Sequence, residues 1–338
     1  MKKIIALAAA VLLSLTLLAG CAGEPAPESS APVSSAPAYE PVDINITAIA
    51  GPTGVGLVDL MQKQADKTAA NNYAFNVVSD PAQAVAAISN GSADIAAVPT
   101  NLASTLYKKT GGKVQVLAVN TLGVLHILEN GESISSVADL KGKTIYTSGQ
   151  GANPEYILKY VLEKNNIDPA KDVTIEFVND NDTLATLVAN GTAKVAMVPE
   201  PKASACLIQN KALRRALNMT EEWNKVGGGD ASLMMGCVVA RTAFVQENPE
   251  AVAKFLEEYK ASINAVVADV DTASQQCVTF GIIPKAPIAK QAIPNCGLTY
   301  VDGSGMKTAL SAYLTILHSY NPAAIGGALP ADDFYYVG

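Results

Sequence analysis

The sequence predicts an α/β fold with two lobes, and three observations carry this prediction. A ten-residue stretch at 90–99, Asn-Gly-Ser-Ala-Asp-Ile-Ala-Ala-Val-Pro, returns at 190–199 as Asn-Gly-Thr-Ala-Lys-Val-Ala-Met-Val-Pro. Each copy follows a strand-like segment, a glycine-rich turn at 51–56 or 148–151, and a helix-like segment. A chain of 338 residues, 49% hydrophobic and 16% charged, suits two cores and is too long for one simple core.

Each copy has the pattern of a helix, a turn and a buried strand. Apolar residues at helical spacing, at 84–88 and 184–188, end at an Asn-Gly pair, where glycine can adopt the left-handed conformation that caps a helix. The segments 95–98 and 195–198 are apolar on both faces, as buried strands of parallel sheets are. We therefore expect each lobe to be a mainly parallel sheet flanked by helices.

Ligand-binding residues are expected in loops beyond the strand ends, where open α/β sheets bind ligands. A proline after each buried strand, Pro99 or Pro199, begins such a loop, and the glycine-rich turns can direct backbone N–H groups at a ligand. Two such loops suggest a ligand held between the lobes. The candidate ligand-binding residues are Pro52, Thr53, Gly54, Thr100, Asn101, Asn120, Thr121, Ser148, Gly149, Gln150, Gly151 and Glu200.

Glu200 is the most informative charged candidate. It follows a buried strand and precedes Pro201, so it can face the cleft and pair with a ligand amine or a protonated ring nitrogen. The alternative is a solvated loop carboxylate. For the neutral candidates the alternatives are an ordinary strand-helix turn at the glycines and a helix cap at Asn101, as also at Asn153.

The N-terminal residues 1–21 are predicted to be an export signal. Lys2 and Lys3 precede an apolar run, and Leu-Ala-Gly-Cys at 18–21 resembles the lipobox of bacterial lipoproteins. That motif implies cleavage before Cys21 and its acylation, as by palmitate, which would anchor the protein at the outer face of a membrane. An unmodified cysteine near a signal-peptidase site is the alternative. Residues 22–42, rich in Ala, Pro, Ser and Glu, are expected to be a disordered linker.

Composition and cysteine spacing exclude several function classes. The formal net charge is −7, and losing the leader removes two lysines, so nucleic acid is not an expected partner. Cys206, Cys237, Cys277 and Cys296 lack the close spacing of a zinc or redox site, and either disulfides (277 with 296, or 206 with 237) or buried free thiols are possible. We expect no catalytic residue, no metal and no cofactor.

Histidines do not suggest catalysis either. The chain has two, His126 and His318, in apolar segments without a neighbouring nucleophile arrangement, and core positions are favoured for both.

Domain boundaries follow from the order of these segments. The first lobe is predicted at 43–122 and is completed by 238–338, whose helical segments begin near 249 and 306 and whose tail, from 322, is expected to lie over the surface. The second lobe is predicted at 123–237. The chain would cross between lobes at 123–128 and return at 232–240, which gives two crossover segments.

At this point the sequence resembles the substrate-binding lipoproteins of ABC importers, in the group associated with nitrate, sulfonate, taurine and thiamine-precursor uptake. The segments that carry the resemblance are Cys21, Gly-Pro-Thr-Gly at 51–54, the stretch 90–99, Ser-Val-Ala-Asp-Leu-Lys-Gly-Lys at 136–143, Glu-Pro at 200–201, Phe-Val-Gln-Glu-Asn-Pro-Glu at 244–250, and the ending 326–336. The resemblance covers the whole mature chain and rests on the order of these segments.

The resemblance implies a two-lobed periplasmic-binding-protein fold of type II. It also implies a monomer that captures a small polar molecule by hinge closure and delivers it to an ABC permease with its ATPase, at the extracytoplasmic face of the cell membrane. Two other functions stay open from the sequence. One is an enzyme of the same fold acting on a menaquinone or pyrimidine precursor, and the other is a surface ligand sensor.

Overall fold

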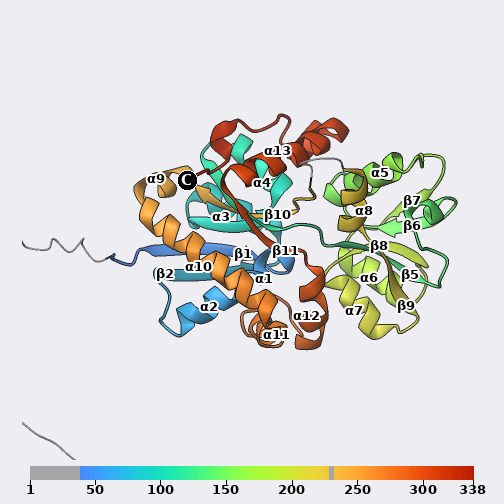
Figure 1. Cartoon of the computed structure of the whole chain (residues 1–338), viewed down its shortest axis with the longest axis horizontal. Helices are drawn as coiled ribbons and strands as arrows, with labels where there is room; N and C mark the ends of the chain where they lie inside the picture. The colour runs from blue at the N-terminus through green and yellow to red at the C-terminus, as the bar shows by residue number, and fades with distance from the viewer. Residues whose placement is uncertain (1–38, 228–231) are drawn as a thin grey trace, which may run out of the picture. The chain divides into compact units, whose positions relative to one another are not determined.

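The computed structural model describes residues 39–227 and 232–338, and the predicted leader with Cys21 and nearly all of the linker lie outside these ranges. Two β-sheets organise the described chain (Figure 1). The first sheet holds β1 (Asp43–Ile49), β2 (Asn72–Val78), β3 (Ile95–Pro99), β4 (Val114–Thr121), β10 (Gly236–Arg241) and β11 (Leu298–Asp302). The second holds β5 (Leu125–Asn130), β6 (Thr144–Thr147), β7 (Thr174–Phe177), β8 (Val195–Pro199) and β9 (Leu213–Asn218). We call each sheet with its covering helices a lobe.

The strand order confirms the duplication read from the repeat. The first sheet runs β11-β4-β10-β3-β1-β2 and the second β7-β6-β8-β5-β9. Reversing the second order aligns β9-β5-β8-β6-β7 with β4-β10-β3-β1-β2, so the two repeated strands, β3 and β8, occupy equivalent places. The single unmatched strand is β11, at the edge of the first sheet.

The expectation of mainly parallel sheets is confirmed, with local exceptions. β1 pairs in parallel with β2 and β3, and β6 pairs in parallel with β7 and β8. However, β10 lies antiparallel between β3 and β4, and β5 lies antiparallel between β8 and β9. β5 and β10 are each the first strand after the chain changes lobes. Each enters its sheet from the side that faces the other lobe, so its direction is reversed. The edge strand β11 also pairs antiparallel, with β4.

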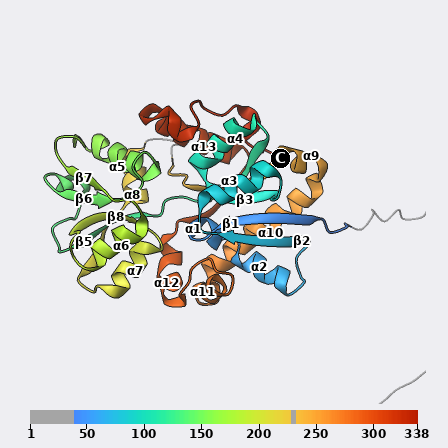
Figure 2. The same cartoon turned by 180° about the vertical axis from the view of Figure 1, so that it is seen from behind.

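Helices cover both faces of each sheet, and a 3₁₀ turn at Val137–Leu140 precedes β6 (Figures 1 and 2). Those of the first lobe are α1 (Pro52–Val55), α2 (Val58–Ala65), α3 (Pro81–Asn90), α4 (Thr100–Thr110), α9 (Thr242–Glu247), α10 (Pro249–Ala268), α11 (Val270–Thr279), α12 (Ala286–Ala292) and α13 (Gly303–Tyr320). Those of the second are α5 (Asn153–Lys164), α6 (Asn181–Ala189), α7 (Lys202–Gln209) and α8 (Met219–Val226). The Asn-Gly turn ends α3 with Gly91 in the left-handed conformation, at φ 81°, as predicted.

Each expected crossing segment, 123–128 and 232–240, overlaps the strand that it leads into. Three residues, 122–124, separate β4 from β5, and β10 already begins at Gly236. The crossings are tightly packed: Leu122 N–H donates to the carbonyl oxygen of Gly297 at 2.8 Å. A Cβ on Gly297 would lie 2.6 Å from the backbone oxygen of Gly123. The connection between the lobes therefore has little free volume.

Gly123→Ala is expected to lower the free energy of unfolding by about 1–3 kcal/mol, the usual cost of overpacking. Its Cβ would lie 1.9 Å from Thr220 Oγ1 and 2.7 Å from Leu233 Cδ2, so α8 must shift. Gly305→Ala is the matched control, because nothing lies within 4 Å of the added Cβ in α13 and alanine favours a helix. Urea denaturation measures the stability of both variants. Equal denaturation midpoints for Gly123→Ala and the parent would contradict the tight packing around Gly123.

The C-terminal segment 322–338 lies over the first lobe with most of its residues exposed, and three buried residues anchor it. Two 3₁₀ turns, Pro322–Ile325 and Asp332–Phe334, form there. The ring of Phe334 is fully buried and packs edge-on against Tyr107, and Tyr335 forms a parallel bridge with Val116 of β4. The segment thus closes one side of the first sheet.

Two helices of the C-terminal region contact the second lobe. α12 packs against α7, and α13 packs against α5. The apolar core that contains Leu310 and Tyr313 of α13 continues into Tyr160 and Trp223 of the second lobe. A separate cluster, with Leu184 and Ala203, fills the opposite face of the second sheet. The lobes therefore share a core on the α5 and α8 side, and Glu40–Gly338 forms one compact unit.

Candidate functional site

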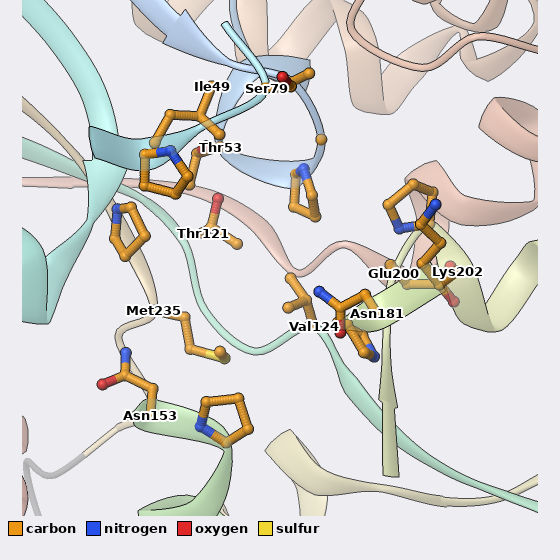
Figure 3. A pocket seen from close by; sticks show the side chains of 18 of the residues that line it. Ile49, Thr53, Ser79, Thr121, Val124, Asn153, Asn181, Glu200, Lys202 and Met235 are labelled. Carbon is orange, nitrogen blue, oxygen red and sulfur yellow. The ribbon is translucent and has the colours of Figure 1, made fainter. Parts of the chain in front are cut away.

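A cavity of about 760 Å³ lies where the two lobes face each other (Figure 3). Its first-lobe wall comes from the end of β1, from α1, and from residues beside the starts of α3 and α4. Its second-lobe wall comes from the starts of α5, α6 and α7. The lining residues are Ile49, Ala50, Gly51, Pro52, Thr53, Ser79, Pro81, Pro99, Asn101, Leu102, Thr121, Val124, Ala152, Asn153, Pro154, Asp180, Asn181, Asp182, Pro199, Glu200, Pro201, Lys202, Met235, Ile282 and Pro284.

The structure brings part of the predicted set to this cavity. The candidates that line it are Pro52, Thr53, Asn101, Thr121 and Glu200. The candidates that do not are Gly54, Thr100, Asn120, Ser148, Gly149, Gln150 and Gly151. Contact with a ligand stays a prediction for all of them.

The predicted loops after β1 and β3 are helices. Residues after Gly51 form the single turn α1, and α4 begins directly at Thr100. Gly51 has φ 112°, a backbone conformation that glycine adopts readily, and its carbonyl accepts from Gly54 N–H at 2.9 Å. Gly54 is packed tightly, since an added Cβ would lie 2.7 Å from the backbone oxygen of Ile49. The glycines thus allow a close turn and present Pro52 and Thr53 to the cavity.

Polar groups behind this wall are already engaged. The Asn120 amide donates to the Thr53 carbonyl at 3.1 Å and to the Tyr259 hydroxyl at 2.8 Å, and its Oδ1 accepts from Thr121 Oγ1 at 2.9 Å. The Thr100 hydroxyl donates to the Met234 carbonyl at 2.5 Å. Asn120 and Thr100 therefore support the wall, while Thr121 and Asn101 form part of its surface.

In the second lobe, the residues after the predicted turn at 148–151 line the cavity. Ser148 donates to Asn181 Oδ1 at 2.6 Å, and Gly151 N–H donates to Glu155 Oε2 at 2.6 Å. The turn therefore orients its neighbours, and Asn153 and Asn181 reach the cavity instead. The amide oxygen of Asn153 has no hydrogen-bond partner in the ranges 39–227 and 232–338.

Glu200 is buried and paired, so the alternative of a solvated loop carboxylate is wrong. The residue is 2% exposed, and Oε1 accepts from Arg215 Nη2 of β9 at 2.5 Å. Oε2 accepts from Ser204 N–H at 3.2 Å, and Arg215 also donates to Ser204 Oγ at 2.8 Å. Burial raises the pKa of the Glu200 carboxyl, and Arg215 opposes that rise. Pairing with a ligand cation stays a prediction, in competition with Arg215.

The buried histidine and thiols are poorly suited to catalysis. His126 lies 3.8 Å from Glu200 Oε1 and 3.3 Å from the Asn295 carbonyl, and burial lowers its pKa to about 4. His126 is a core residue as predicted, whereas His318 on α13 is only half-buried. Burial raises the pKa of Cys206 to about 11. The four described cysteines are free and buried, so the disulfide alternatives are wrong.

Sequence reasoning missed several lining residues. A helix cap was one of two interpretations of Asn153, but Ala152 holds the cap position and Asn153 is the first residue of α5. Asn181 begins α6 of the second copy, in the place that Pro81 holds in the first, and the constant repeat offset could have indicated it. Met235 precedes β10 and Ile282 follows α11, where no pattern in the sequence marked a site.

The described ranges hold neither a cluster of metal-ligating side chains nor a membrane-spanning helix. In residues 39–227 and 232–338, no three side chains of His, Cys, Asp or Glu converge as metal ligands would. No helix in the same part of the chain is long and apolar enough to cross a bilayer.

Comparisons with known proteins agree with this architecture. An ABC transporter from Parabacteroides distasonis has a TM-score of 0.74 at 20% identity, over 87% of this chain and 98% of that one. The Escherichia coli aliphatic sulphonate binding protein SsuA has a TM-score of 0.68 at 14% identity, over 88% of this chain and 92% of that one. The Synechocystis PCC 6803 nitrate-binding protein NrtA has a TM-score of 0.58 at 14% identity, over 83% of this chain and 82% of that one. At these identities the likeness shows the fold, which is the two-lobed type expected.

Sequence comparisons point the same way. A protein of Bacillus subtilis (strain 168), YtlA, named for a provisional binding role, is 28% identical over 123 residues. That match spans 36% of this chain and 34% of YtlA, about a third of each. The family model for the phosphonate periplasmic substrate-binding proteins of ABC transporters matches residues 56–224, half of the chain. The chain therefore belongs to the family of periplasmic substrate-binding proteins of ABC transporters.

Proposed function

We propose that this protein captures one small molecule in the cavity between its lobes, closes around it, and delivers it to an ABC permease with its ATPase. The observation that supports this proposal most directly is that both lobes line the same cavity. A ligand touching both walls stabilises the closed arrangement by its differential affinity for that state, which is the physical basis of hinge closure. The narrow crossing at 122–124 and the return before β10 would serve as the hinge.

Scattering and transport experiments test the two parts of the proposal. Small-angle scattering of the purified monomer should show a smaller radius of gyration with a bound ligand than without it. Deleting the permease genes should abolish uptake of that ligand by cells. If no molecule in a broad metabolite panel compacts the protein, the proposal that it captures a ligand by closing is refuted. If uptake persists without the permease, the proposal that the protein delivers its ligand to that permease is refuted.

Lipid anchoring is a further part of the proposal, carried by the sequence at 18–21 because Cys21 lies outside the described residues. Cys21→Ser is expected to abolish labelling of the protein with a palmitate analogue, because the thiol that carries the acyl chain is gone. Metabolic labelling of cells measures this. The control is Cys206→Ser, which should keep its label. A Cys21→Ser protein that stays labelled would contradict the assignment.

We also propose that the ligand leaves chemically unchanged, in contrast to an enzyme of this fold. Burial keeps His126 neutral at physiological pH, and burial also raises the pKa of Cys277, to about 12, so neither is a ready base or thiolate nucleophile. Native mass spectrometry of the freshly purified protein, followed by identification of the released molecule before and after incubation, tests this. A changed mass of the released molecule would favour an enzyme. A surface sensor is distinguished by uptake that does not require the protein.

A further inference from the structure

We infer that the ligand presents hydrogen-bond acceptor oxygens, as in a sulfonyl, carbonyl or carboxylate group, to the second-lobe wall, where the amide nitrogens of Asn153 and Asn181 donate to them. The site selects this group by its acceptors and not by its charge, so an uncharged acceptor serves as well as an anion. This inference rests on the proposed function, because it describes how the cavity between the lobes would hold its ligand. Related or similar proteins are named for the anions phosphonate, sulphonate and nitrate.

Asn153 turns its amide nitrogen to the cavity. The residue is 4% exposed and lines the second-lobe wall, and its Oδ1 is fully buried without a partner in the described ranges. Nδ2 is therefore the part of this amide that a ligand can reach, and Figure 3 shows it on the side towards Met235. Because an amide nitrogen donates and does not accept, a ligand at Asn153 needs an acceptor.

Asn181, the first residue of α6, offers a second amide nitrogen on the same wall. Its Oδ1 accepts from Ser148 Oγ at 2.6 Å, which fixes the rotation of the amide and leaves Nδ2 for a ligand. In residues 39–227 and 232–338 no hydrogen bond uses Nδ2 of Asn153 or of Asn181. Two such donors on one wall suit a group with two or three acceptor oxygens.

The side-chain carboxylates of this wall already have donors. Asp180 accepts from the N–H of Thr183 at 2.7 Å and from its hydroxyl at 3.0 Å, and Asp182 forms a salt bridge with Lys202. Both oxygens of Glu200 also accept hydrogen bonds. A ligand that carries only donors would compete with these bonds, whereas an acceptor meets amide nitrogens that have no partner in the described chain. The wall therefore favours an acceptor.

Charges at the cavity nearly balance. α4 and α5 begin beside it without a side-chain cap, and each helix start is equivalent to about half a positive charge, which favours anions. The Asp180 carboxylate on the lining opposes these two starts. The other formal charges are paired, Lys202 with Asp182 and Glu200 with Arg215. The amide donors are therefore left to decide which ligand binds.

The apolar part of the wall accommodates an apolar body. Ile49, Val124 and Ile282 are buried there, and Met235 supplies an adaptable thioether. Such walls bury a ring or a short chain, while a few polar groups orient the polar end. A compact molecule with an apolar body and an acceptor head, turned towards the second lobe, therefore fits the cavity.

Three probes that share a benzene ring test the inference. Benzenesulfonate has an anionic acceptor head, methyl phenyl sulfone has an uncharged one, and benzylamine at neutral pH has only donors. Calorimetric titration of the purified chain should give binding at concentrations up to about 10 mM, as expected for fragments of this size. We expect the sulfonate and the sulfone to bind within about tenfold of each other, and each at least about tenfold more tightly than benzylamine.

Two variants locate the recognition. Asn181→Asp keeps the oxygen that Ser148 binds and replaces the nitrogen by an oxygen, so the sulfone should bind about tenfold more weakly and benzylamine at least as tightly as to the parent. Asn153→Ala should also weaken the sulfone about tenfold. Asn190→Asp is the matched control, because it adds the same charge at the other end of α6 and keeps the oxygen that accepts from Thr192 N–H. Thermal unfolding of each variant reports separately whether it folds.

Each outcome decides the inference. Benzylamine that binds the parent as tightly as the sulfone overturns it, and so does a sulfonate that binds more than about tenfold more tightly than the sulfone, because charge would then select the ligand. Sulfone binding that is unchanged in the folded variants overturns it, as does failure of all three probes to bind. The proposed function is judged separately. A donor-only ligand that compacts the protein in scattering would refute the acceptor head and leave capture by closure intact.

Discussion

Replacing Arg215 with alanine is expected to lower the free energy of unfolding by about 3–5 kcal/mol at neutral pH, the usual cost of removing one partner of a buried ion pair. Glu200 is 2% exposed, and Arg215 supplies its single guanidinium contact. Without Arg215 the carboxylate would stay buried beside only neutral groups among the residues described, Ser204 and, at 3.8 Å, His126. Because the Arg215 side chain is itself 23% exposed, water can enter the gap, and a value near the lower end is expected.

The stability lost in Arg215→Ala should depend on pH, and the pKa of Glu200 decides whether the loss grows or shrinks as the pH falls. Burial raises this pKa in the folded state above the ordinary value of 4.5 that applies to the unfolded chain, and Arg215 lowers it. For a raised carboxyl, the stabilising contribution is fully present below the unfolded pKa and is lost as pH rises through the folded pKa. Removing Arg215 raises the folded pKa further. The difference between Arg215→Ala and the parent should therefore shrink as the pH falls from 7 towards 4.5.

Urea denaturation across this pH range measures the effect. Glu200→Gln removes the charge that needs compensation, so the double variant Arg215→Ala with Glu200→Gln should regain much of the loss. Lys202→Ala is the contrasting control, since its pair with Asp182 is exposed and such pairs contribute about 0–1 kcal/mol. An Arg215→Ala loss that stays constant from pH 7 to 4.5 would rule out an uncompensated carboxylate.

Short-range patterns predicted the repeated unit well. The Asn-Gly turn, the buried strands β3 and β8 and the start of α10 at Pro249 each depend on residues that are neighbours in sequence. The mainly parallel sheets were predicted as well, but the reversed strands β5 and β10 were not, because they take their direction from the crossing and not from their own residues. Phe334 was missed for a similar reason, since its burial depends on Tyr107.

The site shows the same limit. Its place beyond β3 and β8 was predictable, because the carboxyl ends of strands in such sheets bind ligands. The ion pair of Glu200 was not predictable. Its partner Arg215 lies on β9, and the sequence did not indicate that β9 lies near the end of β8. Asn120 likewise had no predicted partner, but its amide donates a hydrogen bond to the Tyr259 hydroxyl of α10. Which polar groups are already satisfied depends on tertiary contacts.

The aromatic cluster between the lobes sets the last prediction. Trp223 of α8 is fully buried, with its ring centroid 4.3 Å from that of Tyr160 and 5.7 Å from that of Tyr313 on α13. Trp223→Ala is expected to lower the free energy of unfolding by about 3–5 kcal/mol, because the cavity left by a large ring is only partly refilled. Since α13 belongs to the first lobe, the same change loosens the joint between the lobes.

Circular dichroism in urea, which does not depend on tryptophan fluorescence, measures this loss. A single transition in the parent should separate into two in Trp223→Ala, with the second lobe unfolding at lower urea, because the shared core couples the lobes. Tyr313→Phe is the matched control. Its buried hydroxyl has no partner among the described residues, so removing it should change the free energy by less than about 1 kcal/mol. A single transition in Trp223→Ala, displaced by less than about 1 kcal/mol, would show that the cluster does not join the lobes.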